Sequence, residues 1–600
     1  MTESHSFYTY LPHDAPKRLR GYKYRGEDRS YIYKYLWSAL CRYAVKFLPP
    51  WLAPNVITIT GLAFVCISHA ILAYYMPKLT AKDPNYLFEN EMNMSYRKEF
   101  IPQPPSLVFV LVAASMFLYQ FLDNLDGHQA RRTGTSSPLG LLVDHGCDAF
   151  NCIISSLSIA ASVSAGPCWK TWVILLNTVT TFFMNTWEEY YRGILILPII
   201  NGPNEGILVA ISIYLWTAWI GGPQWWYDNT IKISETWLPE VFRQPAPDAA
   251  VAIERTIIRF VCTFQSYLFG SHENSTYFPY LPFIFHSNCS ASYVENLPKP
   301  VLVVFNKDLC ISCDEQIVTS KYWKGHSMLQ RMVLRLYDIG GHKLKIRYNT
   351  LMVWFMTLAA IWTCAGNIYQ VFKAIRRRIY LNQQCSGKDS GSIAQLMPGF
   401  WFGRHFPFLY SLVELSPLVV LVFMANVFFF ASQENIFRQH PRIFCWTVGL
   451  LFTKLTVHLM LAHLCGIEFQ PFRRTFLPVF LFGLHTTLTF LHGEAKLMQK
   501  QSVSTLTETF LNNKNNQIIP SCQMVGEHSR FTYILDENLI LYEFFALSVV
   551  TFAHLAWNAV REIASALNVQ IFRVPLDKQM MLCRQIADGK ARSISSKKNV

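Results

Sequence analysis

Long apolar runs separated by polar segments recur along most of the chain. Each run is near the roughly 20 residues that an apolar helix needs to cross the hydrocarbon core of a bilayer. The ten runs lie at about 53–76, 106–122, 139–164, 170–186, 206–222, 351–372, 407–430, 443–466, 475–493 and 540–560. This pattern predicts an all-α, polytopic integral membrane protein with about ten transmembrane helices.

The composition agrees with this prediction. Hydrophobic residues make up 51% of the chain and charged residues 15%, whereas a soluble domain has roughly a quarter charged residues. The net charge is +14, but the basic residues flank the apolar runs, where they report membrane topology and attraction to anionic lipid. We therefore expect the lipid bilayer, and no nucleic acid, as the partner of these charges.

Clusters of basic residues also predict the orientation. KRLRGYKYR precedes the first run, KAIRRR follows the sixth, FRR separates the eighth from the ninth, and RQIADGKARSISSKKNV ends the sequence. Because cytosolic segments carry the excess of lysine and arginine, a cytosolic N-terminus and ten spans place all of these clusters in the cytosol. The same count puts the glycosylation sequons at Asn93, Asn274 and Asn288 on the lumenal side. The polar segment between the second and third runs then faces the cytosol.

That segment carries four aspartates in the stretch DNLDGHQARRTGTSSPLGLLVDHGCD. Asp123 and Asp126 are three residues apart, and Asp144 and Asp148 are four apart, spacings that put each pair on one face of a helix. Between the pairs, Ser137 followed by proline is typical of a helix N-cap with proline at the first helical position. We therefore predict a helix, a short turn and a second helix, with the two carboxylate pairs facing each other.

Four converging carboxylates repel one another and are costly to desolvate at a membrane interface. Divalent cations remove this conflict, and hard oxygen ligands suit Mg²⁺, Mn²⁺ or Ca²⁺. Four carboxylates can hold two such ions, as in phosphoryl transfer, and Mg²⁺ usually completes its shell with substrate phosphates. The alternative is that the aspartates only solvate a turn, but it does not explain why Asp144 and Asp148 lie within the apolar run LGLLVDHGCDAFNCII.

Small residues accompany the aspartates. Gly127 and Ala130 leave the first predicted helix bare, and Gly140 does the same one turn before Asp144 on the second. A ligand can therefore approach the backbone of both helices. The guanidinium of Arg131 offers a bidentate donor for phosphate.

The complete pattern is D-x2-D-G-x2-A-R-x8-G-x3-D-x3-D, and it resembles the signature of the CDP-alcohol phosphotransferase family at all eight fixed positions. The stretches LAPNVITITG, DHGCD, WEEYYRG and NGPNEG resemble motifs of the eukaryotic choline/ethanolaminephosphotransferase branch. The resemblance extends over about 20–222 and 349–575 and leaves out 223–348.

The resemblance implies an enzyme that transfers phosphocholine or phosphoethanolamine from CDP-choline or CDP-ethanolamine to diacylglycerol. The products are phosphatidylcholine or phosphatidylethanolamine, and CMP. It also implies two Mg²⁺ or Mn²⁺ ions held by Asp123, Asp126 and Asp144, with Asp148 completing the second site or aiding deprotonation. Family members that use another alcohol, such as inositol, are the nearest alternative.

The resemblance also assigns residues to the nucleotide. Gly127, Ala130 and Gly140 would make room for the cytidine and ribose, and Arg131 would pair with phosphate. Asn55 would either hydrogen-bond the nucleotide or cap the first transmembrane helix.

Two residues compete as the base that accepts the proton of the lipid hydroxyl. One is His145, which follows the third aspartate and would be oriented by the carboxylate of Glu205. The other is Asp148. A histidine near a helix end can instead be a surface or capping residue, and the start of an apolar helix favours a carboxylate such as Glu205 in any case.

These observations divide the chain into four parts. Residues 1–222 comprise an N-terminal amphipathic segment and the catalytic transmembrane half, and residues 351–566 form a second transmembrane half. Residues 223–350 are polar and aromatic, and we expect a lumenal insertion whose single C-x-x-C is weak support for a metal site. Residues 567–600 form a cytosolic tail.

The terminal KKNV resembles the dilysine signal of endoplasmic reticulum membrane proteins, with the Golgi as the alternative location. A homodimer is expected from the family resemblance alone. The competing class of protein is a membrane transporter with an acidic ion site. Transporters typically have broken helices near the midplane in both halves, whereas all four aspartates here lie at one interface.

Overall fold

A computed structural model describes most of the chain outside the expected lumenal insertion. The described residues are 10–12, 14–22, 26–81, 104–199, 202–232, 345–385, 406–432, 435–469, 481, 484–485 and 536–598. The predicted span at 475–493 lies almost wholly outside these residues, as do the three sequons and the C-x-x-C.

Helices make up nearly all of the described structure. In the first half they are α1 (Ala15–Gly21), the π-helix η1 (Tyr33–Trp37), α2 (Ser38–Ala44), the 3₁₀-helix η2 (Val45–Phe47), α3 (Pro54–Tyr75), α4 (Ser106–Thr133), α5 (Pro138–Ser162), α6 (Trp169–Arg192), the π-helix η3 (Gly202–Gly206), α7 (Ile207–Trp219) and α8 (Gln224–Asp228). In the second half they are α13 (Tyr348–Cys385), α15 (Pro407–Val413), α16 (Ser416–Ala431), α17 (Ile436–Gln439), α18 (Pro441–Cys465), α20 (Glu537–Leu567) and α21 (Leu576–Lys598).

Six helical segments in the described part of the chain are long and apolar enough to cross a membrane. They are α3, α4, residues 348–380 of α13, the segment 407–429 formed by α15 and α16, α18, and α20. They coincide with six of the predicted runs. Helices α5 and α6 occupy the third and fourth runs, and α7, in the fifth, has 13 residues, fewer than a span requires. The all-α membrane architecture is confirmed, whereas the count of ten spans is not.

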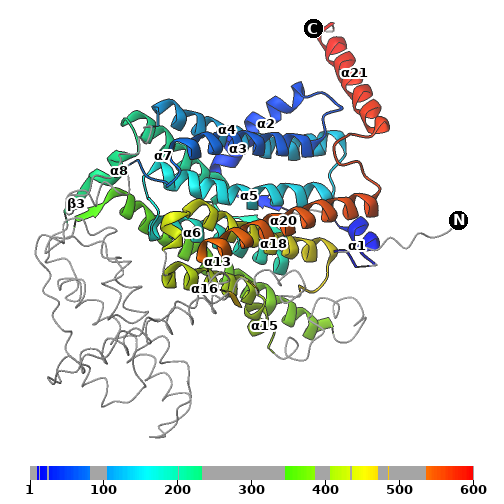
Figure 1. Ribbon diagram of the computed structural model, residues 1–600. Helices are drawn as coiled ribbons and strands as arrows, with labels where there is room; N and C mark the ends of the chain where they lie inside the picture. The colour runs from blue at the N-terminus through cyan, green and yellow to red at the C-terminus, as the bar shows by residue number, and fades with distance from the viewer. Residues whose placement is uncertain are drawn as a thin grey trace, which may run out of the picture.

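The long helices form a bundle in which α3 packs against both α4 and α5, and α18 packs against α5, α6 and α20 (Figure 1). Helix α18 is buried along almost its whole length. Its approach to α5 requires a glycine, because a Cβ at Gly449 would lie 2.6 Å from Cγ1 of Ile153. Since α5 carries half of the aspartates, this contact fixes the aspartates relative to the second half of the chain.

The junction of α4 and α5 has the predicted helix–turn–helix form. Helix α4 ends at Thr133 and is followed by the C-cap Gly134, whose φ of 64° lies in the left-handed region that glycine adopts readily. Helix α5 then begins at Pro138, and the side chain of Ser137 accepts a hydrogen bond from the backbone N–H of Gly140 over 3.3 Å. The predicted N-cap and first-turn proline are therefore confirmed.

Segments from both ends of the chain join the bundle at this junction. Strand β1 (Gly26–Asp28) pairs in parallel with β2 (Leu195–Leu197), which follows α6, while β3 (Thr230–Lys232) pairs with β4 (Lys345–Arg347) elsewhere. From the C-terminal side, the ammonium of Lys578 donates a hydrogen bond to the carbonyl of Gly134 over 2.6 Å. Beyond this contact, α21 projects away from the bundle (Figure 1).

Candidate active site

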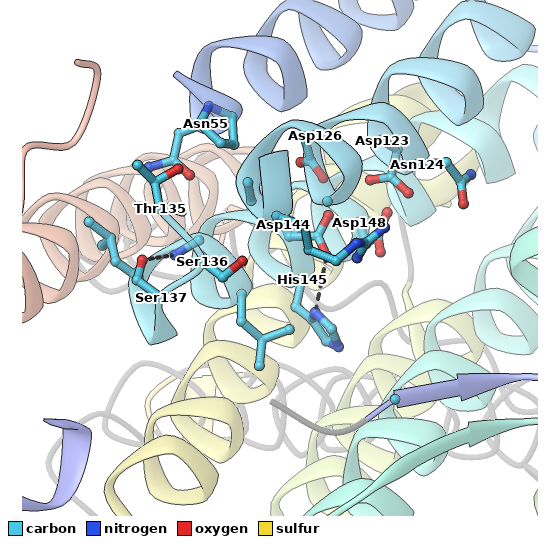
Figure 2. A pocket seen from close by; sticks show the side chains of 18 of the residues that line it. Asn55, Asp123, Asn124, Asp126, Thr135, Ser136, Ser137, Asp144, His145 and Asp148 are labelled. Atoms are coloured by element: carbon cyan, nitrogen blue, oxygen red, sulfur yellow. Dashed lines mark hydrogen bonds and ion pairs between the residues drawn. The ribbon is translucent and has the colours of Figure 1, made fainter. Parts of the chain in front are cut away.

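A cavity of about 410 Å³ opens at the α4–α5 junction. All four aspartates of the signature line it: Asp123, Asp126, Asp144 and Asp148, called the aspartate group below. Figure 2 shows the aspartate group together at one part of this cavity and the α4–α5 turn at another. Segments 26–28 and 569–578 supply further lining residues. The predicted convergence of the two carboxylate pairs is therefore present in the structure.

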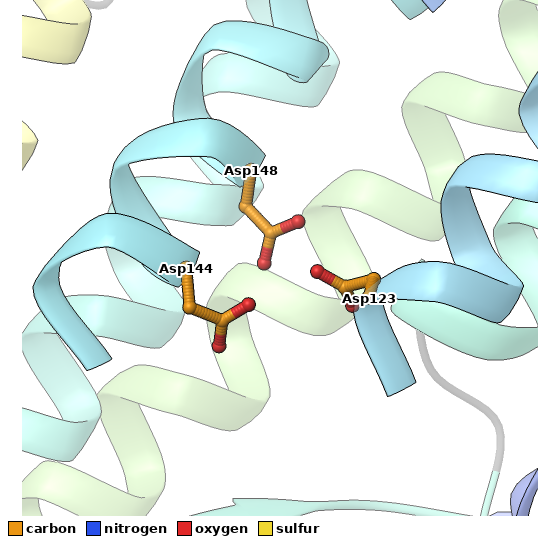
Figure 3. A group of neighbouring side chains, drawn as sticks. All are labelled: Asp123, Asp144 and Asp148. Atoms are coloured by element: carbon orange, nitrogen blue, oxygen red, sulfur yellow. The ribbon is translucent and has the colours of Figure 1, made fainter. Parts of the chain in front are cut away.

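Three members of the aspartate group could hold a metal ion. One carboxylate oxygen from each of Asp123, Asp144 and Asp148 lies within 4.8 Å of the other two, and the three side chains point toward one another (Figure 3). Oδ1 of Asp123 and Oδ1 of Asp144 are both buried and have no hydrogen-bond partner among the described residues. Buried, unsatisfied carboxylate oxygens at this spacing fit a hard divalent cation.

Two members of the aspartate group accept hydrogen bonds from hydroxyl groups. The side chain of Asp126 accepts a hydrogen bond from Oγ1 of Thr58, on α3. Oδ1 of Asp148 accepts one from the phenol of Tyr119, over 2.6 Å. Tyr119 lies one helical turn before Asp123 on α4. Because each carboxylate has two oxygens, these donors fix orientation and leave a second oxygen for another ligand.

The residues expected at the nucleotide also line the cavity: Asn55, Gly127, Ala130, Arg131 and Gly140. Asn55 does not cap its helix, because the N-cap of α3 is Ala53 and no side chain caps this end. Its amide instead donates a hydrogen bond to the carbonyl of Ile571 over 2.9 Å. A Cβ on Gly140 would lie 3.7 Å from Oδ1 of Asn55. The missing side chain therefore leaves open a space that Asn55 borders.

His145 lines the cavity, and its two ring nitrogens face different carboxylates. Nδ1 lies 3.7 Å from Oδ2 of Asp144, and Nε2 lies 3.4 Å from Oε2 of Glu189, on α6. Glu205, which we expected to orient this ring, accepts a hydrogen bond from the hydroxyl of Ser30 over 2.6 Å. The structure thus brings Glu189, and not Glu205, to His145.

Several residues that line the cavity or donate hydrogen bonds to its aspartates were missed by sequence reasoning. Thr58 and Tyr119 could have been found, because each lies about one turn from a predicted site residue on the same helix. Glu189 belongs to the stretch WEEYYRG, but nothing in that stretch pairs it with His145. Arg573 and Lys578 carry no comparable signal, since they reach the cavity from the segment after α20. Tertiary contacts alone bring them to the site.

Comparison with known families agrees with the fold and the aspartate geometry. Residues 51–228 match the family model described as CDP-alcohol phosphatidyltransferase. Residues 51–228 are therefore similar to this family's domain, and they lie within a helical membrane protein. The matched residues include the whole α4–α5 junction and the aspartate group.

The chain is also similar to three curated relatives. The chain is 37% identical over 235 residues to choline/ethanolaminephosphotransferase 2 of Arabidopsis thaliana, which covers 38% of this chain and 54% of the relative. It is 33% identical over 225 residues to choline/ethanolaminephosphotransferase 1 of Saccharomyces cerevisiae, covering 38% and 52%. It is 31% identical over 219 residues to ethanolaminephosphotransferase 1 of Homo sapiens, covering 35% and 51%.

The chain thus spans about half the length of the curated relatives it matches. The resemblance expected over 349–575 stays a prediction, as do the boundaries of the four parts of the chain.

Proposed function

We propose that this protein transfers phosphocholine or phosphoethanolamine from a CDP-amino alcohol to diacylglycerol, giving a phospholipid and CMP. The convergence of the aspartate group on one cavity, inside a CDP-alcohol phosphatidyltransferase domain, carries this proposal. The names of the Arabidopsis and yeast relatives support the choline and ethanolamine head groups.

In the proposed complex, the pyrophosphate of the CDP-alcohol lies beside the aspartate group. Two Mg²⁺ or Mn²⁺ ions bound there would neutralise the phosphate charge and stabilise the charge that develops in phosphoryl transfer. Asp123 and Asp144 offer unsatisfied oxygens to such ions, and Asp126 and Asp148 each keep one oxygen outside their hydroxyl contact. Arg131 adds a cationic donor for phosphate at the same cavity.

The reaction is a single displacement at phosphorus. The diacylglycerol hydroxyl attacks the phosphorus that bears the amino alcohol, the bond to the CMP oxygen breaks, and the hydroxyl proton passes to a base. We assign His145 as this base, because its Nδ1 is buried, has no hydrogen-bond partner within the described part of the chain, and faces Asp144. Asp148 is the weaker candidate, since the phenol of Tyr119 already donates to it within the metal-competent group.

The location and orientation of the protein are inferred from the predicted topology. We place the protein in the endoplasmic reticulum membrane with its cavity facing the cytosol, because the basic clusters flank that side of the predicted spans. A diacylglycerol that stays in the bilayer can then meet a cytosolic nucleotide at the interface. A homodimer remains part of the proposal on the family resemblance.

Microsomes from cells that express the chain test the proposal. They are supplied with radiolabelled CDP-choline or CDP-ethanolamine, diacylglycerol, and Mg²⁺ or Mn²⁺. Labelled phosphatidylcholine or phosphatidylethanolamine should appear together with equimolar CMP, and chelation of the metal should stop the reaction. Uptake of label without lipid product would identify a transporter, and no metal-dependent product above control microsomes would refute the proposal.

A further inference from the structure

Glu189 occupies an unusual position for a carboxylate. Its side chain is 2% exposed, lies on the last turns of α6, and still lines the cavity. A buried carboxylate is costly unless cations or hydrogen bonds compensate it. Within the described structure, an imidazole lies beside each of its two oxygens: Nε2 of His145 is 3.4 Å from Oε2, and Nε2 of His463 is 3.8 Å from Oε1.

His463 ties this carboxylate to the N-terminal segment. The ring belongs to the last turn of α18, and its Nε2 lies 3.2 Å from the phenol of Tyr22. The two rings meet edge to face, with centroids 5.7 Å apart and planes at 84°. Burial, with the charge of Glu189, raises the pKa of the Tyr22 phenol. His463 is therefore held on the side of Glu189 away from His145.

We propose that Glu189 is a positioning residue for His145, an inference that rests on the proposed function. Its carboxylate accepts the Nε2–H of His145 and so selects the tautomer whose bare nitrogen is Nδ1. Nδ1 is the ring nitrogen on the side of Asp144, where the proposed phosphorus and lipid hydroxyl meet. Without this acceptor, the imidazole can rotate or carry its proton on Nδ1, and neither state takes the hydroxyl proton.

The separation of 3.4 Å is long for a hydrogen bond, and Oε2 of Glu189 has no hydrogen-bond partner among the described residues. Catalytic hydrogen bonds are often long in a site without substrate and tighten when substrate binds. A buried acid such as Glu189 could have either of two roles at this cavity: it could position His145, or it could bind the ammonium group of the substrate. A positioning acid acts only through His145, whereas an acid that binds the substrate ammonium acts without it.

The test compares Glu189→Gln with Glu188→Gln. Glu188 is the adjacent, largely buried carboxylate of α6, but it pairs with Arg192 and is not among the described residues that line the cavity. We expect Glu189→Gln to lower kcat by about 10- to 100-fold, the range seen when a supporting acid is removed from a catalytic histidine or ligand. KM for the CDP-alcohol should stay within about twofold, and Glu188→Gln should retain wild-type kcat.

A variant that carries both His145→Ala and Glu189→Gln tests whether Glu189 acts through His145. In a His145→Ala background, Glu189→Gln should lower kcat by less than about threefold further, because residues that act as a unit are not additive. Full activity of Glu189→Gln overturns the inference. So does an undiminished effect in the His145→Ala background, or a rise in KM at unchanged kcat, which would mark direct binding of the ammonium.

Folding is followed by thermal unfolding of the purified protein in detergent. If Glu189→Gln does not fold, His463→Gln provides the second variant, with an expected fall in kcat of about threefold or more and an unchanged KM. Wild-type kcat in a folded His463→Gln would then overturn the inference. A wild-type protein that makes no phospholipid would refute the proposed function itself, which is a different result from any of these.

Discussion

The cavity holds two sets of charged residues that reach it in different ways. The aspartate group comes from one continuous stretch of chain, within the residues that match the family model. The second set, called the remote group here, comprises Glu189, Arg573 and Lys578, from the end of α6 and the segment after α20. Arg573 and Lys578 lie outside the matched residues 51–228. We therefore propose that the aspartate group provides the chemistry, and that the remote group positions the base and binds substrate.

The most direct test of this difference in role removes a carboxylate from the aspartate group. Asp123→Asn keeps the shape but removes one charge from a position where Oδ1 has no hydrogen-bond partner in the part of the chain that the structure describes. We expect phosphotransferase activity to fall by about a thousandfold, the scale of losing a principal electrostatic contact to the reacting group. Activity in microsomes at saturating substrate and metal measures this effect.

A readout other than activity accompanies this variant. Electron paramagnetic resonance of Mn²⁺ should show weaker binding to the purified Asp123→Asn protein than to wild type. Asp14→Asn is the control, because Asp14 is an exposed carboxylate that pairs with Arg18 and does not belong to the described lining of the cavity. More than about a tenth of wild-type activity in Asp123→Asn would refute the role assigned to the aspartate group.

The same contrast explains what could be predicted from the sequence. The aspartates, Gly140 and the Ser137 cap are related by helical spacing and local capping chemistry, so their convergence follows from the order of the residues. The contact between His145 and Glu189 depends instead on how α6 packs against α5. No local spacing encodes this packing, and our choice of Glu205 as the partner relied on family resemblance rather than on geometry.

The fold, like the site, has features that the local sequence predicts and features that it does not. The apolar runs predicted the long helices, because a membrane-spanning helix must satisfy its own backbone hydrogen bonds over a fixed length. Where a run is short or polar, length and composition no longer decide between a span and a buried helix. That is the case for α7, with its 13 residues, and the predicted number of spans is not confirmed there.

Within the remote group, Arg573 tests substrate binding. Arg573 is one of the residues that line the cavity, and it belongs to the segment between α20 and α21. If it contacts the substrate phosphates, Arg573→Ala should raise KM for the CDP-alcohol about tenfold and leave kcat nearly unchanged, since a hydrogen bond to a charged group contributes roughly 1.5–3 kcal/mol. Steady-state kinetics at two salt concentrations should show a smaller difference at high salt.

Arg584→Ala is the matched control for this variant, because Arg584 is an exposed arginine of α21 that does not belong to the described lining of the cavity. Its KM should equal that of wild type. Equal KM values for Arg573→Ala and Arg584→Ala would remove Arg573 from the remote group. A fall in kcat alone would assign it to the chemistry, and the two groups would no longer differ in role.

The smallest expected effect lies inside the aspartate group. Tyr119→Phe removes the hydroxyl that donates to Oδ1 of Asp148, while the other oxygen of Asp148 stays available to the proposed metal. We expect activity to fall only about three- to tenfold and the protein to lose about 1 kcal/mol of stability, the scale of one buried hydrogen bond. Tyr214→Phe is the matched control, because Tyr214 is also fully buried but its hydroxyl has no partner among the described residues.

Kinetics of Tyr119→Phe and its control Tyr214→Phe distinguish two roles for Asp148. If Asp148 only helps to hold the metal, the concentration of Mn²⁺ required for half-maximal activity should rise about threefold in Tyr119→Phe, because a supporting donor outside the metal ligands tunes affinity. If Asp148 is itself the base, its hydrogen-bonding environment enters the chemical step, and kcat at saturating metal should change instead. A loss confined to kcat would therefore transfer the role of base from His145 to Asp148, and Glu189 would have no base to position.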